Sequence, residues 1–181
     1  ISSLKYGDTS LIVRCFTEKE GLKTYLIKGV LSAKKGNIKA AYFQPLTQLK
    51  IEAIHNAKGN LNSLKEVHIV NPYRNIHSNI FKQTIVLFLS EILSSTIQEE
   101  EENEALYSYL ETSFCWLDTH DKTSNFHLLF LLNLSKYLGF YPDISNVDFQ
   151  YFNLFEGSFT QSTIEKEIIF GENLVQFKKL L

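Results

Sequence analysis

The 181-residue sequence lacks the features that mark membrane proteins, disulfide scaffolds and metal sites. No apolar run reaches the ~18 residues that a membrane-spanning helix needs, so we expect no membrane association. The two cysteines, Cys15 and Cys115, are too few for a disulfide framework or a zinc site, and we predict buried thiols in a reducing cytoplasm. Methionine is absent, which suggests that the natural start of the protein is missing.

Catalytic motifs are missing as well. The five histidines form no HExxH pattern and pair with no cysteine. The segment YGDTS at 6–10 is polar and contains a glycine, but it lacks the spacing of a phosphate-binding loop, and we interpret it as a turn into a strand. The single Trp116 lies on an apolar helical stripe and is predicted to be in the core. We therefore expect no enzyme activity, no cofactor and no bound metal.

The sequence does contain a strong asymmetry of charge. Residues 1–82 hold 13 Lys and Arg against 5 Asp and Glu, a net charge of +8, whereas residues 83–181 hold 5 against 15, a net charge of −10. Such a difference between the two halves favours a polyanionic partner for the first half. The alternative is two modules of opposite charge that partly neutralise each other.

The first 71 residues have the pattern of β structure. Four runs show alternating or strand-like patterns, at 10–17, 22–30, 45–54 and 62–70. Short strands at close intervals favour a small closed barrel over an open sheet, which would leave its edges exposed. A barrel needs a further strand, and we expect that this first strand belongs to the missing start.

After residue 71 the period becomes helical, which predicts an α+β protein with domains at 1–71 and 72–181. Three helices are predicted, the third beginning after Ser124 and forming the centre of a bundle. The first helix is expected to face inward through Phe81, Ile85, Phe88 and Ile92, widened by Leu89 and Leu93, and the second through Leu106, Leu110, Phe114 and Leu117. A small irregular segment is predicted at about 145–171, before a final strand and helix.

The strongest candidate for a binding site is the basic connection between the second and third predicted strands. Lys28, Lys34, Lys35 and Lys39 lie within twelve residues, and Arg14 and Lys23 come from neighbouring strands. Lysines near a row of phosphates release condensed counterions, so this cluster predicts nucleic-acid binding with little sequence preference. Tyr42 is a candidate for stacking on unpaired bases, and the alternative is that Tyr42 and Phe43 pack the mouth of the barrel.

The order of these features resembles the RecO family of bacterial recombination mediators. The resemblance rests on Tyr6-Gly7-Asp8, Phe16-Thr17, Gly21, Lys28-Gly29 and Gln44-Pro45, and on the later segment LLFLLNLSKYLGFYPD. It covers nearly the whole chain. The resemblance implies an oligonucleotide-binding (OB) fold β-barrel followed by a helical domain.

The family resemblance also implies a function and partners. RecO proteins bind single- and double-stranded DNA, anneal complementary strands, and work with RecR and RecF to load RecA on DNA coated by the single-strand binding protein, SSB. We therefore expect a non-enzymatic DNA repair and recombination mediator in the bacterial cytoplasm, associated with the nucleoid. The alternative function is a protein-interaction scaffold whose basic barrel docks an acidic protein.

Two expectations concern the helical half. Many family members hold zinc with four cysteines after the GYxPD helix, but this chain has no cysteine there, and we expect packing of Phe149, Tyr151, Phe152 and Phe155 in place of zinc. The acidic tail of SSB needs a basic partner, and the candidates are Lys136 with its neighbours Leu129, Leu132 and Tyr137. The alternative for this helix is a core element with one exposed lysine.

Overall fold

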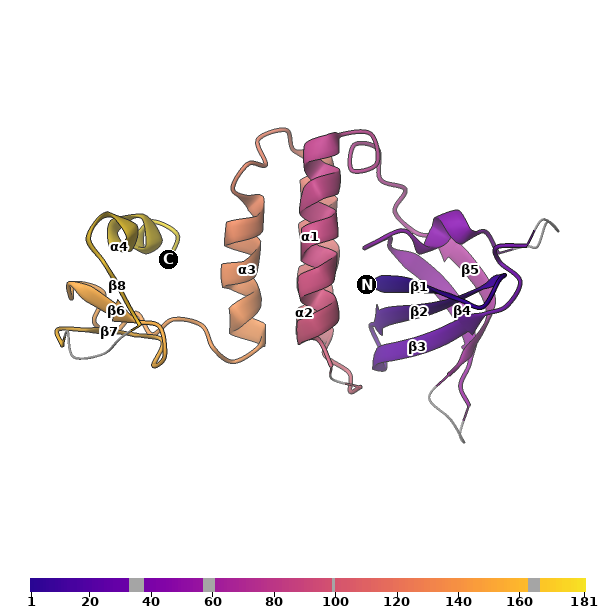
Figure 1. The fold of residues 1–181 in the computed structure, drawn as a ribbon, viewed down its shortest axis with the longest axis horizontal. Coiled ribbons are helices and arrows are strands. Elements are labelled where there is room, and N and C mark those ends of the chain that lie inside the picture. Colours follow the sequence, from indigo (N-terminus) through magenta and orange to yellow (C-terminus); the bar gives the residue numbers. More distant parts are fainter. Residues whose placement is uncertain (33–37, 57–60, 99, 163–166) are drawn as a thin grey trace. The chain divides into compact units, whose positions relative to one another are not determined.

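The computed structural model describes residues 1–32, 38–56, 61–98, 100–162 and 167–181 (Figure 1). The chain forms two compact units, Ile1–Thr123 and Ser124–Leu181. The first unit contains strands β1–β5 with helices α1 and α2, and the second contains α3, β6–β8 and α4. None of the helices in the described part of the chain is long and apolar enough to cross a membrane.

The strands of the first unit form a three-stranded sheet and a hairpin. Antiparallel β1 (Ser2–Tyr6), β2 (Ser10–Thr17) and β3 (Gly21–Ile27) make the sheet, and β4 (Leu49–Ile54) pairs with β5 (Ser63–Ile69) in the hairpin. A parallel bridge between Tyr25 and Asn62 joins β3 to the start of β5. Two backbone hydrogen bonds of 2.9 Å hold this bridge, from Leu26 N to Asn62 O and from Asn62 N to Thr24 O. The strands therefore follow the order β1-β2-β3-β5-β4, and no closed barrel is formed by the described residues.

A core fills the space between the sheet and the hairpin. Val13, Ile27, Phe43 and Val67 are buried there, and Leu11 and Cys15 pack against them. Leu11, Val13 and Cys15 of β2 thus face this core together, because side chains in a strand alternate between two faces. Burial raises the pKa of the Cys15 thiol.

β1 is a strand that the sequence analysis did not predict. It pairs with β2 from Ser2 opposite Arg14 to Tyr6 opposite Ser10. The turn between the two strands contains Gly7 at φ +60°, a conformation that glycine adopts without steric cost, which confirms the predicted turn into a strand. The first unit therefore has five strands within residues 1–71, where four were predicted.

Helices α1 (Ile80–Thr96) and α2 (Glu104–Thr119) belong to the same unit as the strands. The Arg14 guanidinium donates to the backbone oxygen of Ser94 in α1 at 2.9 Å, and the Gln48 amide donates to the backbone oxygen of Glu111 in α2 at 2.8 Å. These bonds link β2 and the residue before β4 to the two helices. The first compact unit therefore extends to Thr123, well past the predicted domain boundary at residue 71.

The buried face of α1 differs from the predicted one. Phe81 is 77% exposed and Phe88 is 43% exposed, whereas the buried residues include Leu89 and Leu93, as predicted, together with Val86 and Lys82. A buried lysine is unexpected because an unpaired ammonium away from water is costly. Here the ammonium is satisfied, since Lys82 Nζ donates to the backbone oxygen of Asp118 at 2.9 Å.

The buried face of α2 is the predicted one, with an exception at its end. Leu106, Leu110, Phe114 and Leu117 are all buried. The predicted core position of Trp116 is wrong, because this side chain is 42% exposed and its ring stacks on His120 with centroids 4.1 Å apart.

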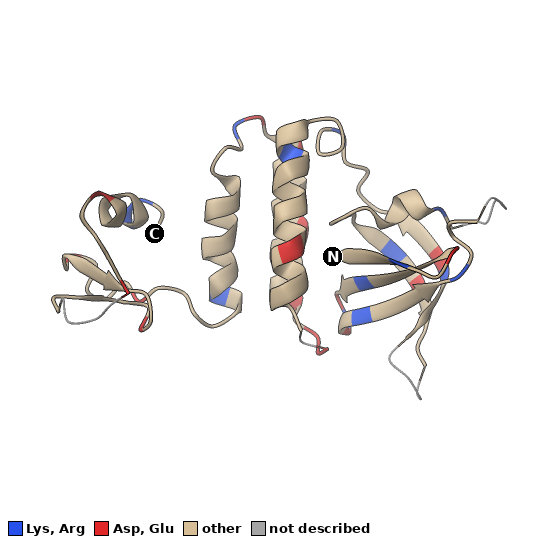
Figure 2. Cartoon of the chain, in the orientation of Figure 1, with Lys and Arg blue, Asp and Glu red and all other residues tan. Residues whose placement is uncertain are grey.

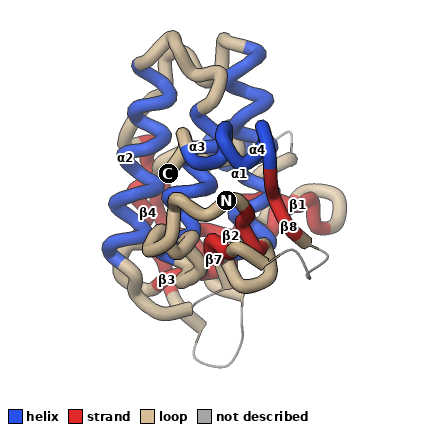
Figure 3. The backbone as a smooth tube through the Cα atoms, turned by 90° about the vertical axis from the view of Figure 1, so that its left-hand side faces the viewer, coloured by secondary structure: helices blue, strands red, loops and turns tan. Residues whose placement is uncertain are grey.

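The second unit begins with α3 (Phe126–Tyr137) and ends with a small sheet and a short helix. The antiparallel strands lie in the order β7 (Ser158–Thr160), β6 (Tyr151–Asn153) and β8 (Ile168–Phe170), and α4 (Gly171–Lys178) follows β8 directly (Figure 3). Phe152, Phe159 and Leu174 form its core. The final strand and helix predicted from the sequence are therefore confirmed.

Aromatic packing holds this small sheet together, as expected, but not with every predicted residue. The Phe152 ring meets those of Phe159 and Phe177 edge to face, each at 4.9 Å, and Phe149 packs against the same core. Phe155 is 90% exposed, and its predicted place in this core is wrong because it lies in the turn after β6. Among the described residues, no cluster of three or more histidine, cysteine, aspartate or glutamate side chains could hold a metal ion.

Candidate nucleic-acid interface

The basic connection begins and ends at exposed lysines. Lys28 directly follows β3, and Lys39 directly precedes the 3-10 helix η1 (Ala40–Phe43). A hydrogen bond of 2.9 Å from Leu31 N to Thr9 O fixes the start of the connection beside the turn between β1 and β2. Lys34 and Lys35, the central lysines of the predicted site, lie outside the described residues.

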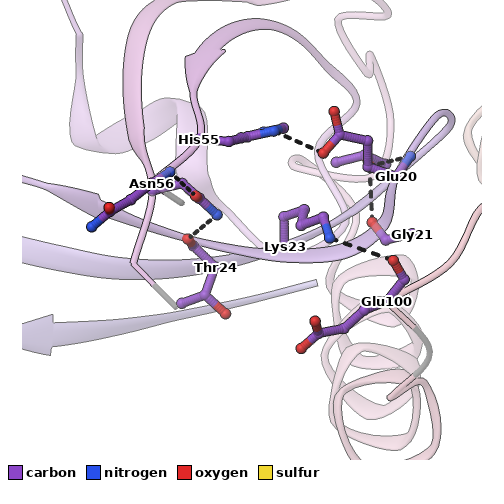
Figure 4. A network of polar contacts seen from close by, with 9 residues as sticks. Glu20, Gly21, Lys23, Thr24, His55, Asn56 and Glu100 are labelled. Carbon is purple, nitrogen blue, oxygen red and sulfur yellow. Dashed lines mark hydrogen bonds and ion pairs between the residues drawn. The ribbon is translucent and has the colours of Figure 1, made fainter. Parts of the chain in front are cut away.

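Three other predicted contact residues have intramolecular partners. The Arg14 guanidinium donates to the backbone oxygen and hydroxyl of Ser94, at 2.9 and 3.2 Å. The Lys23 ammonium lies 3.4 Å from the backbone oxygen of Glu100 (Figure 4). Tyr42 is half-buried and packs against the core that contains Phe43, which favours the packing interpretation of these two aromatic residues. The structure therefore does not group Arg14, Lys23 and Tyr42 with Lys28 and Lys39 on one open surface.

Several lysines of the first unit point to solvent without a carboxylate partner. None of the following exposed lysines forms an ion pair with another described residue: Lys5, Lys19, Lys28, Lys39 and Lys50. Lys65 differs, because its ammonium lies 3.0 Å from the Glu52 carboxylate. Figure 2 shows basic residues spread over several strands and the adjoining loops of this unit. This part of the chain can therefore offer separate positive charges to a chain of phosphates.

A cavity in the first unit is a poor phosphate site. It has a volume of about 550 Å³ and lies between the end of β2, strand β4 and helix α2. Its lining carries four glutamates and only two lysines, Lys19 and Lys50: the glutamates are Glu18, Glu20, Glu52 and Glu111. A carboxylate-rich lining repels a polyanion, so the candidate interface is the lysine-bearing outer surface and not this cavity.

A contact between His55 and Glu20 lies at the edge of the cavity. The His55 Nδ1 atom is 2.8 Å from the Glu20 carboxylate, which ties the end of β4 to the turn between β2 and β3 (Figure 4). Tyr25 lines the same cavity and is 1% exposed. Burial, with a smaller effect of the nearby Cys15 and Glu20 charges, raises the pKa of Tyr25 to about 12.

The four residues predicted for the SSB tail lie together on α3. Leu129, Leu132 and Lys136 are spaced three and four residues apart, so they share one side of the helix, and Tyr137 follows. Leu129 is exposed, and the exposed Lys136 donates to Asn133 Oδ1 at 2.9 Å. Its ammonium also lies 4.5 Å from the centre of the Tyr141 ring. This surface therefore combines an apolar side chain with an accessible cation.

Two exposed residues of β1 were not predicted as site residues from the sequence. Leu4 is 68% exposed and Tyr6 is 54% exposed. The signal was present in the alternation of Leu4 and Tyr6 with Ser3 and Lys5, but a run of five residues is too short to stand out against the turn that follows.

Comparison with known proteins defines the class of the chain. Residues 1–73 match the family described as "Recombination protein O N terminal", and residues 77–164 match "Recombination protein O C terminal". The first match covers the β-rich part of the chain and the second covers the part that begins with helices α1–α3. The class is therefore that of a recombination protein with an N-terminal and a C-terminal part.

Individual relatives agree with this class. The DNA repair protein RecO of Flavobacterium johnsoniae is 55% identical over 160 residues, which cover 88% of this chain and 68% of the relative. The RecO proteins of Flavobacterium psychrophilum and Christiangramia forsetii are 50% and 47% identical, over 98% and 100% of this chain and 77% and 76% of their own lengths. The chain belongs to the RecO family of DNA repair proteins, and the resemblance noted in the sequence is confirmed.

Proposed function

We propose that this chain is a DNA-binding recombination mediator that acts without catalysis. Its first unit holds single- and double-stranded DNA by the phosphates, promotes annealing of complementary strands, and helps RecA to replace SSB on single strands. The observation that carries this proposal is the excess of basic residues in positions 1–82, 13 against 5 acidic ones, within a member of a DNA repair family. The proposed place of action is the nucleoid in the bacterial cytoplasm.

An OB-type arrangement of β1–β5 is part of the proposal. The strand order β1-β2-β3-β5-β4, with a parallel bridge between β3 and β5, supports a small, partly open five-stranded barrel of this type. In such folds the outer strands and connecting loops contact nucleic acid. Lys28 and Lys39 at the two ends of the basic connection are then placed to meet phosphates.

The positive charge of the first unit accounts for the proposed annealing of DNA strands. Two DNA strands repel each other, and a protein that neutralises phosphates on both lowers this repulsion through counterion release. Base pairing between the strands then supplies the sequence fidelity, so the protein needs no contacts to base edges. The net charge of −10 in residues 83–181 keeps that half from competing for the same DNA.

The test is the salt dependence of oligonucleotide binding. We expect Lys28→Glu with Lys39→Glu to weaken binding to all sequences alike, measured by fluorescence anisotropy of labelled single strands and duplexes. Loss of two phosphate contacts should reduce the slope of log K against log salt by roughly 1.4 for single strands and 1.8 for duplexes. The matched control is Lys122→Glu, the same change of charge at an exposed residue between α2 and α3. Unchanged affinity and slope in the double variant would remove this connection from the site.

We further propose that α3 receives the acidic, Phe-ending tail of SSB, with RecR and RecF as additional partners of the protein. The support is the pairing of exposed Leu129 with the accessible ammonium of Lys136 on one side of the helix. Binding of a tail peptide should weaken in Lys136→Glu and when the final Phe is removed, and stay unchanged in Lys122→Glu. A peptide that binds equally well without its Phe would contradict this assignment.

A further inference from the structure

The outer face of the β1–β2–β3 sheet carries an apolar surface that the lysine-based proposal does not use. The strand register places Leu4 opposite Ile12 and Ile12 opposite Leu26, so these three side chains form one row across the sheet. Their neighbours in the strands, Val13 and Ile27, belong to the buried core. Because side chains alternate, the row of Leu4, Ile12 and Leu26 lies on the opposite, outward face.

An aromatic side chain lies beside this row. Tyr6 is two residues after Leu4 in β1 and therefore points to the same face. Leu4 and Tyr6 are 68% and 54% exposed, while Ile12 and Leu26 are half-buried. We call these four residues the outer apolar face. Exposed apolar side chains that adjoin further apolar residues on one face mark a binding site more often than isolated exposed side chains do.

A cation adjoins the outer apolar face. The register pairs Tyr6 with Ser10 and Leu11 with Ile27, so its extension by one residue places Lys28 across from Ser10. Lys28 thus stands two strands away from Tyr6, about 10 Å at the usual strand spacing. Lys28 is exposed and has no ion pair with a described residue, whereas the exposed Asp8 lies in the turn directly after Tyr6. The positive charge therefore lies on the β3 side of the face.

We propose that the outer apolar face binds unpaired DNA bases, with Tyr6 stacking on a base while Lys28 contacts a phosphate of the same strand. This inference rests on the proposed DNA binding and adds a base-contact site to it. An exposed aromatic ring next to an apolar surface and a cation matches the two parts of a single-stranded nucleic acid, the π-face of a base and the phosphate. In a duplex the bases are stacked within the helix, so Tyr6 gives the protein a preference for single strands.

The first experiment separates stacking from charge. Tyr6→Ala should weaken binding of a labelled oligo-dT about 5- to 150-fold, the range expected for one lost base stack, and leave its salt slope unchanged. Binding to a duplex of the same length should stay the same. Lys28→Ala should instead reduce the slope by roughly 0.7 for the single strand. The control is Phe155→Ala, which removes an aromatic side chain that is 90% exposed in the second unit.

The second experiment observes the stack directly. Trp116 is the single tryptophan, so Tyr6→Trp in a Trp116→Phe background places one fluorophore on the outer apolar face. We expect oligo-dT to quench its fluorescence and a duplex to quench it much less. Far-UV circular dichroism of each variant checks that the fold is retained.

The outcomes separate the two proposals. A folded Tyr6→Ala protein with unchanged affinity for oligo-dT, together with no quenching of the indole introduced by Tyr6→Trp, overturns the base-contact site and leaves the lysine-based DNA binding standing. Absence of oligonucleotide binding by the unaltered protein overturns the proposed function itself. A dimer in sedimentation that dissociates in Tyr6→Ala, with unchanged affinity for DNA, would assign the face to a second copy of the chain and refute the stacking.

Discussion

The carboxylate of Asp118, near the end of α2, binds the backbone of residues 74–76, which lie between β5 and α1. Removing this carboxylate tests whether these hydrogen bonds stabilise the first unit. Asp118 is 6% exposed. Its oxygens accept three backbone N–H groups, from Arg74 at 2.9 Å, Asn75 at 2.8 Å and Ile76 at 2.9 Å. Its own backbone oxygen accepts the buried Lys82 ammonium.

The size of the effect follows from these bonds. In Asp118→Asn one side-chain oxygen remains for Asn75 and Ile76, but the amide nitrogen then faces the N–H of Arg74, and the negative charge near Lys82 is gone. Hydrogen bonds to a charged group contribute about 1.5–3 kcal/mol each, so we expect the free energy of unfolding to fall by about 2–4 kcal/mol. With an m-value of about 2 kcal/mol per molar urea, the midpoint drops by roughly 1–2 M.

Urea unfolding followed by Trp116 fluorescence measures this directly, because Trp116 is in the first unit, two residues before Asp118. Asp121→Asn is the matched control, since it makes the same substitution at an exposed carboxylate three residues further on. A midpoint for Asp118→Asn within error of that control would refute the role given to these hydrogen bonds.

The pH dependence supplies an independent check. Burial alone raises the pKa of Asp118, but the three backbone N–H donors and Lys82 outweigh it, and the pKa is lowered from its ordinary value of 3.8. A carboxyl whose folded pKa is depressed stabilises the protein above the unfolded pKa, and this contribution is lost as the pH falls through the folded value. The difference between the natural chain and Asp118→Asn should therefore be constant above about pH 5 and shrink below pH 3.8.

Two other predictions concern buried aromatic residues. Phe152→Ala should destabilise the second unit by about 3–5 kcal/mol because it leaves a cavity beside the rings of Phe159 and Phe177, whereas Phe155→Ala should change its stability by no more than about 0.5 kcal/mol. Hydrogen exchange of β6 and β7 measures both, and equal protection in the two variants would contradict the assignment of the core. Tyr25 has a pKa raised to about 12 from 10, so its burial stabilises the fold below pH 10 and loses this effect as the pH rises toward 12. The free energy of unfolding of Tyr25→Phe should therefore fall less between pH 10 and 12 than that of the unaltered chain. Urea unfolding at several pH values measures this, and an equal fall in the two proteins would contradict the raised pKa of Tyr25.

Many helices and strands could be predicted from the sequence because the spacing of apolar residues along the chain indicates them. The strand-like run at 10–17 identified β2, and the spacing of Leu106, Leu110, Phe114 and Leu117 identified the buried face of α2. Both patterns reflect a single side of an element turned to the core. The order of short motifs also identified the family, which the matches over residues 1–73 and 77–164 confirm.

The sequence pattern failed where a side chain has a hydrogen-bond partner far away in the sequence. Lys82 is 1% exposed because the backbone oxygen of Asp118, 36 positions away, accepts its ammonium, and this shifts the buried face of α1 away from Phe81. Arg14 was predicted to meet DNA, which stays a prediction, and its guanidinium has a partner 80 positions away in Ser94 that the sequence pattern did not indicate. Neither contact leaves a periodic signal in the sequence.

The sequence by itself determined the family, the segregation of positive charge into the first half, and most helices and strands, since composition and periodicity are properties of neighbours along the chain. Only the tertiary structure decided which of the basic and aromatic residues are available to a ligand. It packs Tyr42 on a core, engages Arg14 with α1, and leaves Tyr6 exposed on the outside of the sheet. The physical reason is that burial and hydrogen bonding depend on groups that meet across the fold, and the register of β1 against β2 brings them together only when the sheet forms.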